Sequence, residues 1–354
     1  MIVSRKSTVG AVQQKTRLRR PSGPLGCTFR TLKTGPFYRM SAKSRLDDMV
    51  QATLEQLRPK AKSLIVTVYG DAILPHGGSA WLGSLIRLVE PFGLNERIVR
   101  TSVFRLSKED WLTSSHVGRR SYYSLTDTGR RRFEAAHRRI YSYARRPWDR
   151  QWTLVFTNLT GTEGERREAL RRDLGWLGFG QLSPGVMLHP DPDQAAVRQA
   201  LVDAETGDHA VVMRASAESW VAPEALRDVI RTCWDQDRLA QDYLGFLDIF
   251  RPLWRALDGM DDLDPETCFL VRSLLIHGYR RALLRDPMLP DELLASDWPG
   301  AAARLLCRNL YRLVQAPAER HLMSVLETAE GPLPEANAAF FARFGGLAQP
   351  GEAA

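Results

Sequence analysis

The stretch GLNERIVRTSVFRLSKEDWLTSSHVGRRSYYSL (93–125) decides the fold of the N-terminal part of this chain. Asn95 is a favourable N-cap for a helix over 96–108, because its side chain can accept a hydrogen bond from an unpaired backbone N–H. Two runs of β-forming residues follow, 111–115 and 121–125, joined by a turn that contains Gly. The stretch therefore predicts a helix that leads directly into a β-hairpin.

Three further helices are expected before this stretch. Apolar residues recur at helical spacing over 46–57, 60–74 and 79–90, and Pro or Gly follows each run. Helices, a tight turn, another helix and then a hairpin are the order of a winged helix-turn-helix. We therefore predict a winged helix DNA-binding domain over residues 46–148.

One face of the predicted helix 96–108 carries groups suited to DNA. Val99, Val103 and Leu106 form a narrow apolar stripe that would pack the helix onto its domain. Arginine can bond guanine edges with two donors, and short hydroxyl side chains suit bases or phosphates. A solvated basic surface is the alternative for any one arginine. The predicted DNA-binding residues are Arg97, Arg100, Thr101, Ser102 and Arg105 on the helix, and Arg119 and Arg120 at the wing tip.

The charge distribution agrees with a polyanion partner for the N-terminal part only. The chain has 354 residues and a net charge of +8, but residues 1–45 hold eleven basic residues and no acid. Residues 46–150 carry a net +7, whereas 151–354 carry a net −10. We interpret 1–45 as a disordered basic arm, because it lacks hydrophobic periodicity.

The rest of the chain predicts two more domains. Strand and helix patterns alternate over 149–218, which indicates a small ferredoxin-like α+β domain. From Pro223 onward the pattern is almost entirely helical, so a helical domain for effector binding or dimerisation is expected over 219–322, followed by a C-terminal tail over 323–354. The fold class is thus α+β and multidomain.

Composition and motifs exclude several classes of protein. No window approaches 18 consecutive apolar residues, which excludes a membrane-spanning helix. Four scattered cysteines indicate reduced thiols of a cytoplasmic protein. No nucleophile, P-loop or dinucleotide motif occurs, and HPDPD (189–193) is typical of an acidic turn. We expect no catalytic residue, no metal site and no cofactor.

Three runs resemble the PaaX family, the repressors of phenylacetate-degradation operons. They are GGSAWLGSLIRLVEPFGLNERIVRTSVFRL (77–106), WLTSSHVGRRSYYSLTDTGRRRFEAAHRRIY (111–141) and RALLRDPMLPDELLASDWPGAAARLLCRNLYRL (281–313). The resemblance implies a GntR-like winged helix, a middle domain similar to Cas2, a helical C-terminal domain and a homodimer released from DNA by phenylacetyl-CoA. Asp110 and His76 depart from the family, which usually has Gly and Arg there.

The stretch HGYRRALLRD (277–286) offers candidate residues for such an effector. One helix turn separates His277 from Arg281, and another separates Arg281 from Arg285, so one face could hold the phosphates of a CoA thioester. The predicted effector-binding residues are His277, Tyr279, Arg281 and Arg285. A helix surface with salt bridges is the alternative interpretation.

Two other functions stay open at this point. The chain could regulate a different catabolic operon and respond to another acyl-CoA or to an aryl acid. It could also be a metal-dependent nuclease through its Cas2-like domain. The strand expected over 153–159 has no carboxylate at its end to hold a metal, which argues against the nuclease. The expected partners are double-stranded operator DNA, an acyl-CoA effector and a second copy of the chain, with no membrane.

Overall fold

The computed structural model describes residues 42–141, 147–157, 164–207, 209–218 and 220–347. The predicted basic arm lies outside these ranges, apart from its last four residues, which belong to helix α1 (Ala42–Leu57). α1 packs against two helices from the C-terminal half of the chain, α9 (Gln236–Leu257) and α10 (Pro265–Leu283). In this respect the arrangement differs from the predicted division, which placed 46–57 with the DNA-binding domain.

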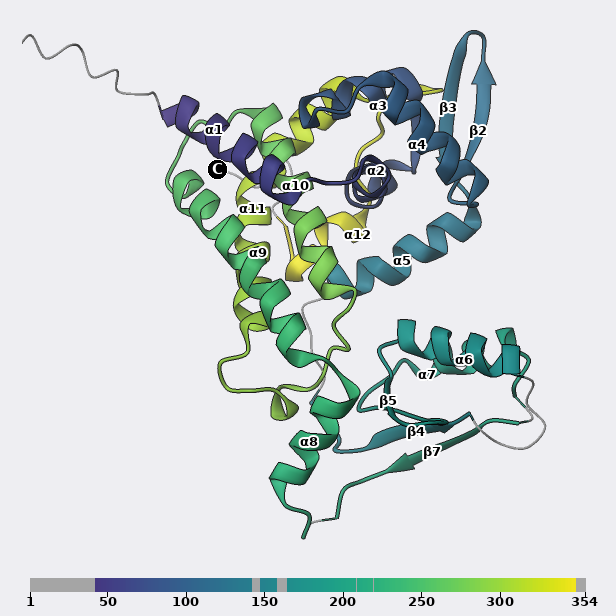
Figure 1. Cartoon of the computed structure of the whole chain (residues 1–354). Coiled ribbons are helices and arrows are strands. Elements are labelled where there is room, and N and C mark those ends of the chain that lie inside the picture. The colour runs from purple at the N-terminus through teal and green to yellow at the C-terminus, as the bar shows by residue number, and fades with distance from the viewer. Residues whose placement is uncertain (1–41, 142–146, 158–163, 208, 219, 348–354) are drawn as a thin grey trace, which may run out of the picture. The chain divides into compact units, whose positions relative to one another are not determined.

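The N-terminal module combines helices with a three-stranded sheet in the order β1-β3-β2. Figure 1 shows the hairpin that β2 and β3 form. α2 continues into a π-helical turn and a 3-10 turn, where a single helix over 60–74 was predicted. A short strand, β1, replaces the first turn of the helix predicted over 79–90. The elements are α2 (Ala61–Val68), η1 (Tyr69–Ile73), η2 (Leu74–His76), β1 (Ser79–Trp81), α3 (Leu82–Val89), η3 (Glu90–Phe92), α4 (Glu96–Lys108), β2 (Leu112–Val117), β3 (Arg120–Leu125) and α5 (Asp127–Tyr141).

The middle module is a four-stranded antiparallel sheet in the order β5-β6-β4-β7, with two helices. Val155 and Met187 are paired neighbours on one face, and they pack with buried residues of α6 and α7. On the other face, Trp152 packs with Ile230 of α8 (Pro223–Cys233), as strand alternation requires. The elements are β4 (Trp152–Phe156), α6 (Gly164–Trp176), β5 (Gly180–Ser183), β6 (Val186–His189), α7 (Gln194–Asp203) and β7 (Val211–Ala215).

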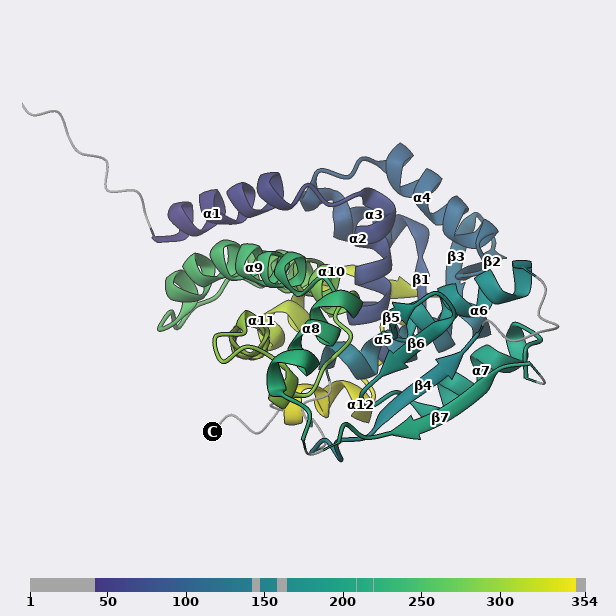
Figure 2. The same cartoon turned by 60° about the horizontal axis from the view of Figure 1, so that its bottom comes forward.

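α10 is the central helix of the C-terminal half, and most of its residues are buried. It packs against α9, α1 and the long helix α11 (Pro299–Val325), and also against α2 and α5 of the N-terminal module (Figure 2). The N-terminal module and these helices consequently share one continuous hydrophobic core. A 3-10 turn, η4 (Asp291–Leu293), lies in the loop before α11.

Residues 326–347 form a packed C-terminal segment, which corrects the prediction of a tail over 323–354. Leu333, Phe340, Phe344 and Leu347 are buried and belong to the shared core. Apolar side chains every few residues could have signalled this packing, but Pro and Gly interrupt the helical pattern. The segment contains β8 (Glu327–Thr328), β9 (Gly331–Pro332), α12 (Ala338–Phe341) and η5 (Arg343–Gly345).

Candidate nucleic-acid interface

Helix α4 begins as the sequence predicts. The Asn95 side chain accepts a hydrogen bond from the backbone N–H of Ile98 at 3.0 Å. Gly93 has a φ of 76°, a left-handed conformation that permits the turn between α3 and α4. Val99 and Val103 are fully buried, and they fix the helix on the module through contacts that include α2. The opposite face of α4 is left to solvent.

The exposed face of α4 is a basic stripe with one aromatic side chain. Its members share helical spacing and face away from the core. They are Arg97, Thr101, Phe104, Arg105 and Lys108, hereafter the α4 stripe. Ser102 is different: it is only 6% exposed and lies on the buried face with Val103 and Leu106. Its prediction as a DNA-contacting residue is therefore wrong for this conformation.

The arginines of α4 differ in their partners. Arg100 is exposed, and it forms an ion pair with Glu96 one turn earlier at 2.7 Å. Within the part of the chain that the structure describes, Arg97 and Arg105 form no ion pair. The hydroxyl of Thr101 donates to the backbone carbonyl of Arg97 at 2.9 Å. Arg97 and Arg105 are thus the two guanidiniums of α4 that a polyanion can engage without breaking an existing pair.

The hairpin places its two predicted arginines in different settings. Arg119 is exposed at the turn beside Gly118, and it has no ion pair among the described residues. Arg120 lies at the start of β3, where its guanidinium stacks on the Trp81 ring at 4.1 Å and bonds the Glu327 carboxylate at 2.8 Å. Arg120 therefore joins the hairpin to the C-terminal segment.

Two features of this surface were missed by sequence reasoning. Phe104 is 59% exposed, and Lys108 lies over its ring at 5.5 Å. The helical spacing of Phe104 from Arg97 and Arg105 could have indicated its place on the exposed face. No local signal could have placed Glu327 beside Arg120, because 207 residues separate them.

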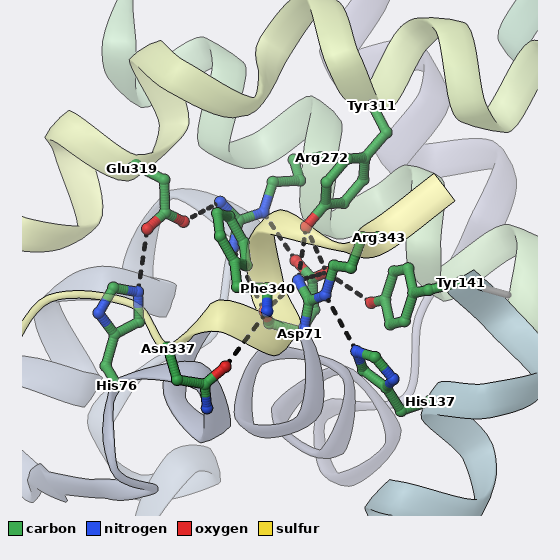
Figure 3. Close-up of polar contacts among 10 residues, drawn as sticks. All are labelled: Asp71, His76, His137, Tyr141, Arg272, Tyr311, Glu319, Asn337, Phe340 and Arg343. Carbon is green, nitrogen blue, oxygen red and sulfur yellow. Dashed lines mark hydrogen bonds and ion pairs between the residues drawn. The ribbon is translucent and has the colours of Figure 1, made fainter. Parts of the chain in front are cut away.

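A buried polar cluster lies beneath the N-terminal module (Figure 3). Asp71, in the π-helical turn η1, accepts hydrogen bonds from Arg272 at 2.7 Å and from Arg343 at 3.2 Å. The hydroxyls of Tyr141 and Tyr311 also donate to its carboxylate, at 2.6 and 3.0 Å. Burial by itself would raise the pKa of Asp71, but the two guanidiniums and the Tyr141 hydroxyl outweigh it and lower that pKa.

The cluster extends to a second carboxylate. Glu319 forms an ion pair with Arg272, and it bonds His76 at 2.9 Å. His76 also bonds the backbone carbonyl of Pro334 at 2.6 Å. Since these residues come from η2, α10, α11 and the C-terminal segment, the cluster connects all of these elements to the N-terminal module.

The predicted effector-binding residues do not share one surface. His277 and Tyr279 are 2% and 1% exposed, and His277 bonds the Thr67 hydroxyl at 3.1 Å inside the core. Burial, with Arg280 and Arg281 nearby, lowers the pKa of His277 to about 4. The interpretation of a surface stripe is wrong for these two residues, because α10 is buried on nearly every side. Arg281 and Arg285 are exposed, and Arg285 pairs with Asp242 at 3.3 Å.

Thiols and possible metal ligands are scattered over the described residues. Cys233, Cys268 and Cys307 are free thiols, and Cys27 lies outside the described residues. Among the residues that the structure places, no three His, Cys, Asp or Glu side chains are grouped so that they could hold a metal ion. His189 accepts a hydrogen bond from the Asp191 backbone N–H at 3.0 Å, as expected for a turn. No described helix is both long and apolar enough to cross a membrane.

Comparisons with known proteins cover most of the chain. Family models match residues 60–129 (PaaX-like protein), 145–227 (PaaX protein central Cas2-like domain) and 234–324 (PaaX-like protein C-terminal domain). The transcriptional repressor PaaX of Escherichia coli (strain K12) is 39% identical over 305 residues, which are 86% of this chain and 96% of that protein. A solved structure, the uncharacterized protein Rv0674 from Mycobacterium tuberculosis, is 25% identical with a TM-score of 0.45, over 73% of this chain and 98% of that one.

The family models and the curated relative define the class of protein as a transcriptional regulator, which confirms the prediction that the chain is not an enzyme. More particularly, the chain belongs to the PaaX family. The resemblance drawn from the sequence is thereby confirmed. The chain has the PaaX N-terminal, Cas2-like middle and C-terminal domains of that family, in a mixed α+β architecture that is helical overall.

Proposed function

We propose that this chain is a cytoplasmic repressor of an aromatic (phenylacetate) catabolic operon, and that it binds operator DNA through the α4 stripe and the hairpin. The observation that carries the proposal is the exposed stripe on α4, in which Arg97 and Arg105 form no ion pair with any residue that the structure describes, together with the tip residue Arg119 on the neighbouring hairpin. Guanidiniums presented on a helix and on an adjacent hairpin suit base edges and phosphates respectively.

The element order supports a winged helix-turn-helix for the N-terminal module. α2, β1, α3, α4 and the β2–β3 hairpin follow one another, and β1 pairs with β3. In this assignment α4 is the recognition helix and the hairpin is the wing. The middle module has the order βαββαβ with the sheet β5-β6-β4-β7, which supports a ferredoxin-like fold.

We propose further that the repressor is a homodimer that reads inverted half-sites. Support comes from β7, which is an edge strand of the middle sheet. Its Val211, Val212 and Met213 are 38%, 39% and 53% exposed, and an unpaired edge with apolar side chains favours pairing with a second chain. Light scattering coupled to size exclusion would give the mass of a dimer, and a monomer would contradict this part of the proposal.

The proposed effector is phenylacetyl-CoA. To empty the operator, the thioester must bind the arrangement that does not hold DNA more tightly than the one that does. The hydrophobic core shared by the N-terminal module and the C-terminal helices supports such coupling. Because the two parts pack directly against each other, a shift of one part changes the packing of the other.

The test is a fluorescence-anisotropy titration of DNA upstream of the chain's own and neighbouring genes. We expect binding that weakens steeply with salt, because each neutralised phosphate releases counterions. Release by phenylacetyl-CoA but not by free phenylacetate would support the function as stated. If DNA binding is tight and unaffected by phenylacetyl-CoA, but another acyl-CoA or an aryl acid releases the DNA, the chain regulates a different catabolic operon. No binding at moderate salt would refute the DNA-binding assignment.

A further inference from the structure

A cavity of about 290 Å³ opens between α5, η2 and the C-terminal segment. Arg130, Glu134, His137 and Arg138 line it from α5, one helix turn after another. Phe340 and Arg343 are among the residues that line it from the C-terminal segment. We call it the α5–α12 cavity. No function proposed above uses these residues as a group.

The charge of the lining favours an anion. Three guanidiniums, those of Arg130, Arg138 and Arg343, face a single carboxylate, that of Glu134. Burial, with Arg343 nearby, lowers the pKa of His137 to about 4, so its ring is neutral at pH 7 and adds no charge. Arg138 is exposed and forms no ion pair among the described residues. Guanidiniums bind carboxylate and phosphate groups with paired hydrogen bonds.

A cavity of similar size has the opposite charge balance. It measures about 310 Å³ and lies between the ends of α9 and α10 and the loop before α11. Its lining includes two arginines, Arg238 and Arg285, but three aspartates. The aspartates are Asp235, Asp242 and Asp286. An anionic ligand therefore has a clear electrostatic preference for the α5–α12 cavity.

Arg343 has hydrogen-bonding capacity left over at the inner wall. Its Nη1 donates to Asp71 and to the Tyr311 hydroxyl, and its Nε donates to His137 Nε2 at 3.3 Å (Figure 3). Its Nη2 is buried and has no hydrogen-bond partner among the described residues. A buried donor without an acceptor is costly, so a shift of Arg343 toward an anion in the cavity would satisfy this donor.

Apart from Asn337, the remaining lining is apolar, and this defines the chemical class of the ligand. Leu74, Pro75, Ala339 and Phe340 supply an apolar wall beside the guanidiniums. A small cavity with an apolar wall and a few polar groups suits an organic molecule more than a bare inorganic ion. The matching ligand carries a carboxylate or phosphate group at one end and an apolar group at the other.

We propose that the α5–α12 cavity is the effector site of this regulator and that it takes an organic anion of this class. As an effector site, the assignment rests on the function proposed above. α5 follows strand β3 of the hairpin after one residue, and Arg343 is bonded to Asp71 of the N-terminal module. The DNA-binding module is thus connected to this cavity in two ways, through α5 and through the contact between Arg343 and Asp71. An anion that bridges α5 and Arg343 would act on both connections.

The test compares two matched pairs of substitutions by isothermal titration calorimetry. R130Q/R138Q removes two cationic groups from the cavity, and R281Q/R285Q removes the two exposed arginines of the predicted α10 stripe. The probes are phenylacetyl-CoA, coenzyme A, phenylacetate and inorganic phosphate. We expect at least a tenfold weaker binding of the best probe in R130Q/R138Q, and unchanged binding in R281Q/R285Q.

Both variants are checked for an unchanged thermal midpoint, so that a loss of binding cannot come from unfolding. The proposal is overturned if R281Q/R285Q alone loses the ligand, if R130Q/R138Q keeps wild-type affinity, or if no probe binds the wild-type protein. Binding of inorganic phosphate equal to that of phenylacetyl-CoA would show that the phosphate alone is recognised, which contradicts the organic class. Equal binding of coenzyme A would show that the phenylacetyl group is not recognised, which contradicts a role for the apolar wall. If the anion binds but DNA does not, the site stands and the repressor function fails.

Discussion

Arg343 donates hydrogen bonds from one nitrogen to both the backbone carbonyl and the carboxylate of Asp71, at 2.9 and 3.2 Å, across 272 residues of chain. Asp71 lies in the N-terminal module, and Arg343 lies near the end of the described chain. Both side chains are fully buried. The C-terminal segment is therefore held to the N-terminal module by a buried ion pair, and breaking this pair would strongly lower the stability of the fold.

Replacing Asp71 with Asn should destabilise the protein strongly. The substitution leaves the buried guanidiniums of Arg272 and Arg343 with one fewer counter-charge, and breaking a buried ion pair on one side costs about 3–5 kcal/mol. Urea unfolding followed by circular dichroism gives the change in the free energy of unfolding. E96Q is the matched control, since it breaks the exposed pair with Arg100, which is worth about 0–1 kcal/mol. Equal losses in the two variants would contradict the importance of the cluster.

Stability should fall as pH drops from about 6.5 to 4. Burial lowers the pKa of His137, His189 and His277 to about 4 in the folded chain, against an ordinary value of 6.5. In this window the unfolded chain binds protons that the folded chain does not, so acid favours unfolding. Below pH 4, protonation of Asp71, whose pKa is lowered, removes further stability. Thermal midpoints across pH 4–8 measure this; a midpoint that is flat between 6.5 and 4 would refute the assignment of neutral buried histidines.

Local patterns predicted most of the elements, and long-range packing accounts for what they missed. The N-cap Asn95 and the spacing of Val99 and Val103 were sufficient to place α4 and its buried face. Ser102 was misassigned because the sequence does not show how much of the circumference of α4 is buried. His277 was misassigned because α10 is covered on almost all sides, and an amphipathic interpretation assumes one solvent face.

The buried cluster could not be found from sequence. Asp71 and Arg272 each interrupt an otherwise apolar run, but nothing local to either run indicates its partner. Only their meeting across 201 residues explains why two charges are buried. The same is true of Glu327 and Arg120, which no local spacing relates.

Arg97 and Arg105, which have no ion pair within the described part of the chain, should matter for DNA binding more than Arg100 does. R97A and R105A each remove a guanidinium that is free to engage DNA, and a bidentate contact to guanine is worth about 1–3 kcal/mol. R100A removes a group that must first leave Glu96, so its loss should be smaller. Anisotropy titrations at two salt concentrations separate the cases: a phosphate contact lowers the salt slope by about one, whereas a base contact relaxes sequence preference. Unchanged affinity in both R97A and R105A would refute the role of the α4 stripe.

Substitutions of Arg119 and Arg120 should have different effects, although the two residues are neighbours at one turn. Replacing Arg119 should change DNA affinity, whereas replacing Arg120 should change the stability of the fold. Arg119 is exposed without an ion pair among the described residues, so R119A should weaken DNA binding and leave the free energy of unfolding within about 0.5 kcal/mol. Arg120 stacks on Trp81 and bonds Glu327, and cation–π contacts at exposed sites are worth about 0.5–1 kcal/mol.

R120A should therefore destabilise the protein measurably, because it detaches the turn end of the hairpin from the C-terminal segment. R120K is the conservative control: it keeps the charge but loses the planar stacking, so it should recover only part of the stability. Urea unfolding and anisotropy on the same preparations give both quantities. If R119A lowered stability as much as R120A, Arg119 would anchor the hairpin equally, and the contact of Arg120 with Trp81 and Glu327 would not be what fixes its position.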